Sequence, residues 1–207
     1  MPVLTLCPVL YLKIAGMRKF ILAITSLLVF ISLSGQDKFT DVRDSNCYRT
    51  ITIQGVTWMA ENLKFKANGG SHFFDHNSDN LPGYGLLYEW KTALNSCPSG
   101  WHLPSGNEFQ TLANYFEQSD KWKKVTSDPF SFAIQLGGMQ DYEGTFSEMD
   151  ESAYYWTSTE YDRGNAEYFS YLIINKMPVI DISRKEDVAE IPGTEKTNKY
   201  SVRCIKN

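Results

Sequence analysis

The sequence predicts an α+β domain with antiparallel sheets, two short helices and long irregular loops. β-Prone segments lie at residues 48–59 and again after residue 130. Helical periodicity is confined to the middle of the chain, at residues 89–116. Strands that are grouped before and after the helices favour an α+β arrangement over alternating strand–helix–strand units.

The bulk composition limits the function classes. The chain has 207 residues, 43% of them hydrophobic, and a formal net charge of -4. This length suits one domain, residues 36–207, preceded by a leader. The sequence contains no stripe of basic side chains, so we do not expect a nucleic-acid partner.

Residues 1–35 have the features of an export signal. Met17-Arg18-Lys19 supplies positive charge, an uncharged apolar run follows to Leu33, and small residues precede a cleavage site at Gln36. Translation that starts at Met17 would suit this pattern. A single-pass anchor is the alternative, although a membrane span needs roughly 20 apolar residues. We therefore expect location in the periplasm, at the cell surface or outside the cell, with no membrane span after cleavage.

The first expected element of the mature chain is a β-hairpin. Residues 48–53 are rich in β-branched side chains, and residues 56–59 form the returning strand. Gln54-Gly55 between them is a two-residue turn. Asn62 follows the hairpin, where its amide is suited to satisfying backbone groups of a loop.

A long loop is expected at residues 66–85, because glycine and polar residues replace any periodic pattern. Within it, Asp75, Asn77 and Asp79 resemble the start of a calcium-binding loop. The glycine and the final glutamate that such a loop requires are both missing. We predict no cofactor, with calcium at these three residues as the alternative to a solvated loop.

The middle of the chain predicts a strand at residues 84–88, a short helix at 89–95 and a longer helix at 106–116. Ser105 and Glu108 have the spacing of a capping box at the start of the longer helix. Four apolar side chains then recur at the spacing of one buried helix face: Phe109, Leu112, Ala113 and Phe116.

The second half of the chain is expected to consist mainly of strands. Between them, residues 141–152 form an acidic loop, which could serve acid–base chemistry, bind calcium or simply be solvated. The expected strands are residues 130–136, 154–160, 168–174, 179–182 and 200–205.

Three cysteines lie outside the leader: Cys47, Cys97 and Cys204. In an oxidising compartment they permit one intramolecular bridge and one leftover cysteine, or an intermolecular bond. We favour a Cys97–Cys204 bridge, because each of these two lies in or next to a strongly patterned segment. Three reduced thiols in the core are the alternative.

Several segments occur in the order found in one known family. They are residues 41–44, 48–53, 58–63, 84–90, 97–105, 132–133, 137–138, 155–160 and 201–204. Together they resemble the Fibrobacter succinogenes major paralogous domain, a family of exported bacterial domains.

The resemblance implies a fold related to C-type-lectin-like domains. In such a fold the last strand, which contains a cysteine, lies beside the first strands, and long loops form the binding surface. It also supports the Cys97–Cys204 bridge. The tripeptides Glu-Pro-Asn and Gln-Pro-Asp of calcium-dependent lectins do not occur in the sequence, so the resemblance does not extend to their sugar site.

The predicted function is a non-catalytic module that binds a glycan or a surface protein. Candidate ligand-contacting residues are the loop aromatics Phe73, Phe74, Trp122 and Tyr142. No enzyme is predicted, because the sequence has no nucleophile elbow, zinc-binding His-Glu-x-x-His or phosphate loop. The alternatives are a structural component of the bacterial envelope and a hydrolase that uses carboxylates or histidine.

Overall fold

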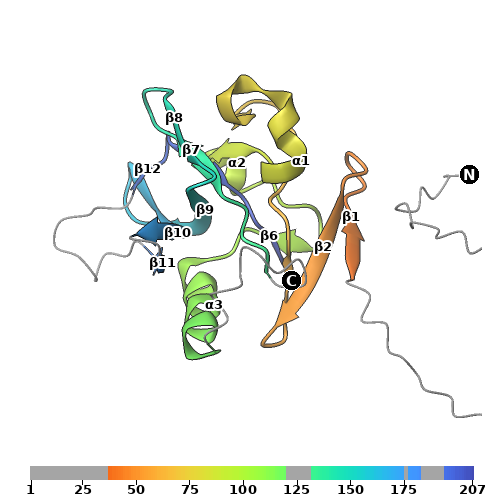
Figure 1. Ribbon diagram of the computed structural model, residues 1–207. Coiled ribbons are helices and arrows are strands. Elements are labelled where there is room, and N and C mark those ends of the chain that lie inside the picture. The colour runs from red at the N-terminus through yellow and green to blue at the C-terminus, as the bar shows by residue number, and fades with distance from the viewer. Residues whose placement is uncertain (1–36, 120–131, 175–176, 183–193) are drawn as a thin grey trace, which may run out of the picture.

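The computed structural model describes residues 37–119, 132–174, 177–182 and 194–207. Two β-sheets and one longer helix, α3, form its body (Figure 1). This mixture confirms the α+β class. The predicted leader at 1–35 and the candidate Trp122 lie outside the described residues. Within the described ranges, no helix has the length and apolar character needed to cross a membrane.

The first sheet joins the two ends of the domain. Its strands lie in the order β1–β2–β3–β14–β6, with Ile205 opposite Trp58. The predicted hairpin is confirmed as β2 and β3, and both of its turn residues, Gln54 and Gly55, have positive φ. The bounds are β1 Lys38–Thr40, β2 Cys47–Ile53, β3 Val56–Met59, β6 Trp101–His102 and β14 Ile205–Lys206.

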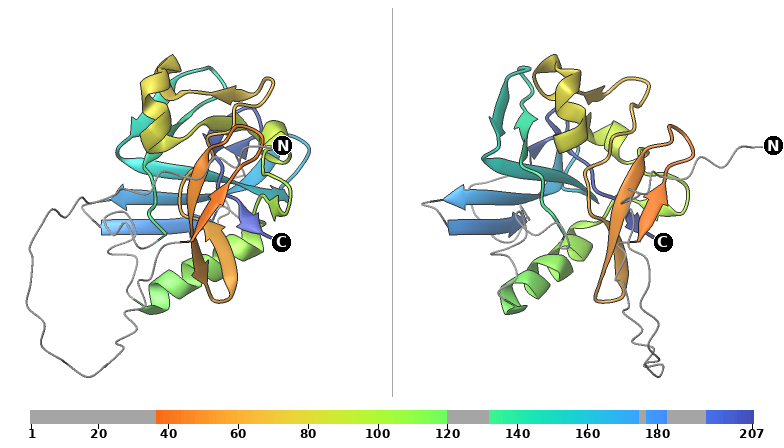
Figure 2. Two further views of the ribbon diagram at one scale, coloured as in Figure 1. Left: turned by 90° about the vertical axis from the view of Figure 1, so that its right-hand side faces the viewer. Right: turned by 45° about the vertical axis from the view of Figure 1, so that its right-hand side comes forward.

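The second sheet follows the order β11–β10–β9–β7–β13–β5–β4, with β8 paired to β7 and β12 to β10. Figure 2 shows that this sheet lies across the molecule from the β2–β3 hairpin. The bounds are β4 Ser71–His72, β5 Leu87–Glu89, β7 Gly137–Gln140, β8 Phe146–Met149, β9 Ser152–Glu160, β10 Asn165–Ile174, β11 Met177–Ile182, β12 Thr194–Glu195 and β13 Lys199–Ser201.

The predicted central helix is confirmed as α3, Gly106–Ser119, which ends three residues later than expected. Its capping box forms as the spacing predicts. The Ser105 amide donates to the Glu108 carboxylate at 2.7 Å, and the Glu108 amide donates to the Ser105 hydroxyl at 3.3 Å. All four apolar side chains of its predicted face are buried. The other helical segments are short: η1 Phe74–His76, η2 Ser78–Asn80, α1 Leu81–Tyr84 and α2 Trp90–Ala93.

The core consists of two aromatic clusters. In the first, Phe109 of α3 stacks on Phe169 of β10 at 4.7 Å between ring centroids and contacts Trp58 of β3 at 5.4 Å. In the second, Trp156 of β9 lies 4.4 Å from Tyr200 of β13. Helix α3 therefore packs between the hairpin and the long strands, where each aromatic pair adds to the area it buries.

Three strand predictions need correction. Residues 132–136 form no strand, because Ala133 has φ 50° and the Phe132 and Ala133 carbonyls accept hydrogen bonds from buried Arg203. The strand expected at 200–205 is broken between Ser201 and Ile205, where the chain passes from the second sheet to the first. The strand expected at 84–88 begins only at Leu87, after the α1 turn.

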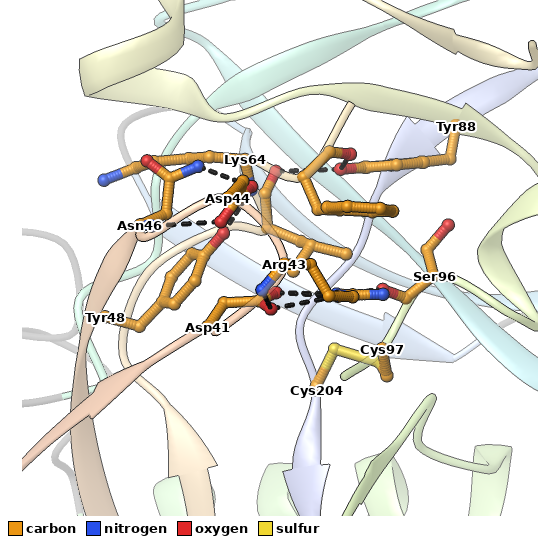
Figure 3. Close-up of polar contacts among 12 residues, drawn as sticks. Asp41, Arg43, Asp44, Asn46, Tyr48, Lys64, Tyr88, Ser96, Cys97 and Cys204 are labelled. Carbon is orange, nitrogen blue, oxygen red and sulfur yellow. Dashed lines mark hydrogen bonds and ion pairs between the residues drawn. A yellow bond between two sulfur atoms is a disulfide. The ribbon is translucent and has the colours of Figure 1, made fainter. Parts of the chain in front are cut away.

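The predicted disulfide is confirmed. Cys97 and Cys204 are joined, with their Cα atoms 5.8 Å apart. The Asp41–Arg43 ion pair lies beside this bridge, and Arg43 donates to the Ser96 carbonyl at 2.8 Å (Figure 3). Asp41 is fully buried, so the ion pair fixes the turn after β1 against the segment that carries Cys97.

Candidate ligand-binding surface

Two segments far apart in the sequence meet at one end of the molecule. The segment containing η1 and α1 lies next to the β7–β8 hairpin (Figure 1). Their contact is aromatic: Phe74 and His76 each lie 5.1 Å from the Phe146 ring, measured between ring centroids. We call residues Phe74–His76, which form η1, the flap.

Strand register places a set of polar side chains on one face of the second sheet, beside the flap. Residues that pair across neighbouring strands point to the same face, as do residues two apart in one strand. His72 pairs with Leu87, which lies two residues from Glu89. Glu89 pairs with Lys199, Lys199 with Gln140, and Gln140 with Phe146. We call the set His72, Glu89, Gln140 and Lys199 the polar floor.

Two atoms of the polar floor are buried without a hydrogen-bond partner. They are Nε2 of His72 and Oε1 of Gln140. Gln140 is only 4% exposed, and its Nε2 donates to the Gly144 carbonyl at 2.9 Å, whereas its Oε1 accepts no hydrogen bond. An unpaired buried polar group costs about 1–3 kcal/mol, so two on one face call for an explanation.

The electrostatics of the polar floor keep His72 neutral. Burial, together with the Lys199 ammonium, lowers the pKa of His72 below its ordinary value, and the Glu89 carboxylate only partly opposes this. An imidazole that starts near pKa 6.5 is therefore uncharged at neutral pH. It offers one donor and one acceptor nitrogen.

The flap has an unusual backbone. Asp75 and His76 have φ of 51° and 54°, which L residues adopt infrequently, although aspartate and histidine tolerate it better than most. Phe73, just before the flap, lies under the Lys66 ammonium at 5.4 Å from the ring centroid. Phe73 and Phe74 are both half-buried.

The three residues of the calcium alternative lie in the flap and just after it. The Asn77 side chain accepts from the Asp79 amide at 3.0 Å and so caps η2, and Asp75 and Asp79 are exposed. In the part of the chain that the structure describes, no three or more histidine, cysteine or acidic side chains are grouped to hold a metal ion.

Two of the candidate ligand-contacting residues, Tyr142 and Phe74, lie in or against the β7–β8 hairpin. Tyr142 is 60% exposed in the turn between β7 and β8, and its hydroxyl donates to Glu143 at 3.2 Å. Phe74 contacts Phe146 at the start of the same hairpin's second strand.

The acidic segment at 141–152 is largely a hairpin rather than the expected loop. Two of its carboxylates accept from tyrosines. The Tyr154 hydroxyl donates to Glu148 at 2.6 Å, and the Tyr84 hydroxyl donates to Asp150. These hydrogen bonds fix the hairpin against β9 and α1.

The sequence did not indicate Phe146, Gln140 or Lys199 as site residues. These three residues come together only because β7 pairs with both β8 and β13. β13 lies far from β7 in the sequence, so local patterns could not indicate this pairing. His72 was visible as a histidine in the long loop, but its position opposite Leu87 depends on the β4–β5 pairing.

The comparisons with known proteins give one match. The family described as the Fibrobacter succinogenes major domain matches residues 51–206. The match includes the flap, the polar floor and both halves of the disulfide. No curated protein and no solved structure matches the chain.

Proposed function

Because the chain belongs to the Fibrobacter succinogenes major domain family, we propose that it is an exported, non-catalytic module that binds a glycan or a surface protein. One observation carries the proposal. Aromatic rings from two separate segments, Phe74 and Phe146, meet near exposed Tyr142 and beside a floor with unused hydrogen-bonding atoms.

Aromatic side chains suit either ligand. Their faces are apolar and stack on the C–H face of a sugar, and at protein interfaces they anchor contacts in desolvated pockets. Tyr142 adds a polar hydroxyl at the rim of the surface. The proposed role of this surface is therefore binding rather than catalysis.

Export is the second part of the proposal. Its support is the leader pattern at residues 1–35 and the Cys97–Cys204 disulfide, since disulfides persist in oxidising compartments. The protein would then act in the periplasm, at the cell surface or outside the cell.

A C-type-lectin-like architecture is the third part. In its favour, the C-terminal strand β14 pairs with β3 of the first hairpin, and the disulfide ties Cys204 to the middle of the chain. The binding surface includes the long segment at 71–84, as such an architecture requires.

A glycan array tests the proposal. The exported protein is applied once with calcium and once with a chelator, and a parallel pull-down uses the producing cell's surface proteins. Phe74→Ala and Tyr142→Ala should each weaken binding at least about fivefold, because each removes an aromatic contact worth about 1 kcal/mol or more. Val42→Ala is the matched control, since Val42 is 91% exposed in the turn after β1.

The outcomes separate the alternatives. Binding that survives the chelator and needs Phe74 supports a metal-free aromatic surface. Binding lost on chelation would favour the alternative of a calcium ion at Asp75, Asn77 and Asp79. A protein that binds neither glycans nor surface proteins overturns the proposal and favours a structural role in the envelope.

A further inference from the structure

We infer that the flap opens over the polar floor to admit a neutral sugar ring, which the floor binds without a metal ion. The inference rests on the proposed binding function and names its ligand class.

The floor has hydrogen-bonding capacity that the folded chain does not use. Gln140 is 96% buried, yet its Oε1 accepts no hydrogen bond, and Nε2 of His72 also has no partner. Glu89 and Lys199 face each other across β5 and β13 without an ion pair among the described residues. Buried polar side chains are normally satisfied, so a ligand is a direct explanation for the unused atoms.

The flap is built to move as a unit. In the described part of the chain, its hydrogen bonds join it only to residues 73–80: the His76 amide donates to Phe73, and the Asn77 amide and Asn80 side chain donate to Phe74. None of its residues is fully buried. Opening would therefore break the Phe74–Phe146 contact and few others, and would release the left-handed backbone at Asp75 and His76.

The chemistry of the floor favours a neutral, hydroxyl-rich ligand. Glu89 and Lys199 have opposite charges that cancel, and His72 is neutral, so the floor has no net charge to attract an ion. Sugar hydroxyls both donate and accept, which suits an amide oxygen, an imidazole, a carboxylate and an ammonium together. The rings of Phe74 and Phe146 would cover the apolar face of the sugar.

Gln140→Met is the sharpest test, because methionine has a similar volume but no acceptor. Binding of glucose, galactose and mannose to the exported protein is measured by titration calorimetry in the presence of EDTA. We expect the variant to lose at least tenfold in affinity for the sugar that binds, while it stays folded, with a modest fall in its unfolding midpoint from the lost hydrogen bond to Gly144. Gln110→Met, the same change at a half-buried position of α3 where the side chain also donates one hydrogen bond, should leave the affinity for the sugar unchanged.

Hydrogen exchange on the unaltered protein provides a second readout, which is independent of whether the variant folds. The amides of residues 74–77 should exchange fast without sugar and become protected when it is bound. Protection from exchange elsewhere with no change at the flap would overturn the inference.

The results distinguish this inference from the proposed function. If glycans bind but Gln140→Met keeps full affinity, the inference is wrong and the binding module stands. A Gln140→Met variant that is less stable and binds normally would assign Gln140 a structural role and overturn the inference. If no ligand of any kind binds the exported protein, the proposed function is wrong, and the inference that rests on it is wrong as well.

Discussion

Glu61 illustrates how single charged residues stabilise the segment after the first hairpin. Its two carboxylate oxygens accept from Arg49 at 2.8 Å and from Lys64 at 2.8 Å, and its side chain is 15% exposed. Burial alone would raise the pKa of Glu61, but the two cations outweigh it and hold the pKa below its ordinary value. The carboxylate therefore stays ionised in the folded protein to a lower pH than in the unfolded chain.

Glu61→Gln should lower the free energy of unfolding by about 1–2 kcal/mol at pH 7, because it removes charge-assisted hydrogen bonds. A depressed pKa gives stability that is complete above the unfolded-state pKa, near 4.3, and is lost as the pH falls through the folded-state value. The difference between wild type and variant should therefore shrink below about pH 4.3 in urea unfolding. Glu117→Gln, at an exposed position of α3, is the control and should leave the free energy of unfolding unchanged. If the difference between wild type and Glu61→Gln does not vary with pH, the lowered pKa of Glu61 is wrong.

At the scale of elements, the start of α3 depends on its cap. Ser105→Ala removes the hydroxyl that accepts from the Glu108 amide and donates to the Glu108 carboxylate. Loss of such a cap costs about 1 kcal/mol, so the urea midpoint should fall correspondingly. Ser99→Ala, at an exposed position before β6, is the control. Equal midpoints for the two variants would mean that packing of Phe109 alone determines where the helix begins.

Elements with local signals were predictable, and those that depend on distant partners were not. The hairpin turn and the capping box each depend on neighbouring residues, so spacing alone revealed them. The segment 132–136 alternates between large apolar residues and small or polar ones, like a strand. Arg203, about 70 residues later in the chain, donates hydrogen bonds to two of its carbonyls, which are therefore not used in strand pairing. No property of the segment itself could indicate that competition.

The candidate site also contains some residues that local sequence features could indicate and others that depend on strand pairing. Phe74 and Tyr142 were visible as aromatics in loops, which is a local property. Gln140 and Phe146 belong to the site only because β7 pairs with β8 and β13, and this register is fixed by tertiary packing. The spacing of Asp75, Asn77 and Asp79 suggested calcium as the alternative to a solvated loop, but it could not show that Asp75 belongs to the flap with its left-handed backbone.

At the scale of the whole molecule, the C-terminal segment connects the two sheets. β13 belongs to the second sheet and β14 to the first, and the chain between them carries two buried connections. Arg203 is fully buried, donates to Asn62 at 2.8 Å and lies over the Phe132 ring at 4.4 Å. Cys204, the next residue, forms the disulfide with Cys97.

The disulfide should therefore be a main source of global stability. It closes a loop of 107 residues, and the chain-entropy relation gives about 4–5 kcal/mol for a loop of this length. The double variant Cys97→Ser, Cys204→Ser should lose about that much in the free energy of unfolding, measured by urea denaturation. Because the variant leaves Cys47 unchanged, it isolates this bridge better than a reducing agent does. A loss below about 1 kcal/mol would mean that the buried contacts of Arg203 hold the two sheets together without the covalent link.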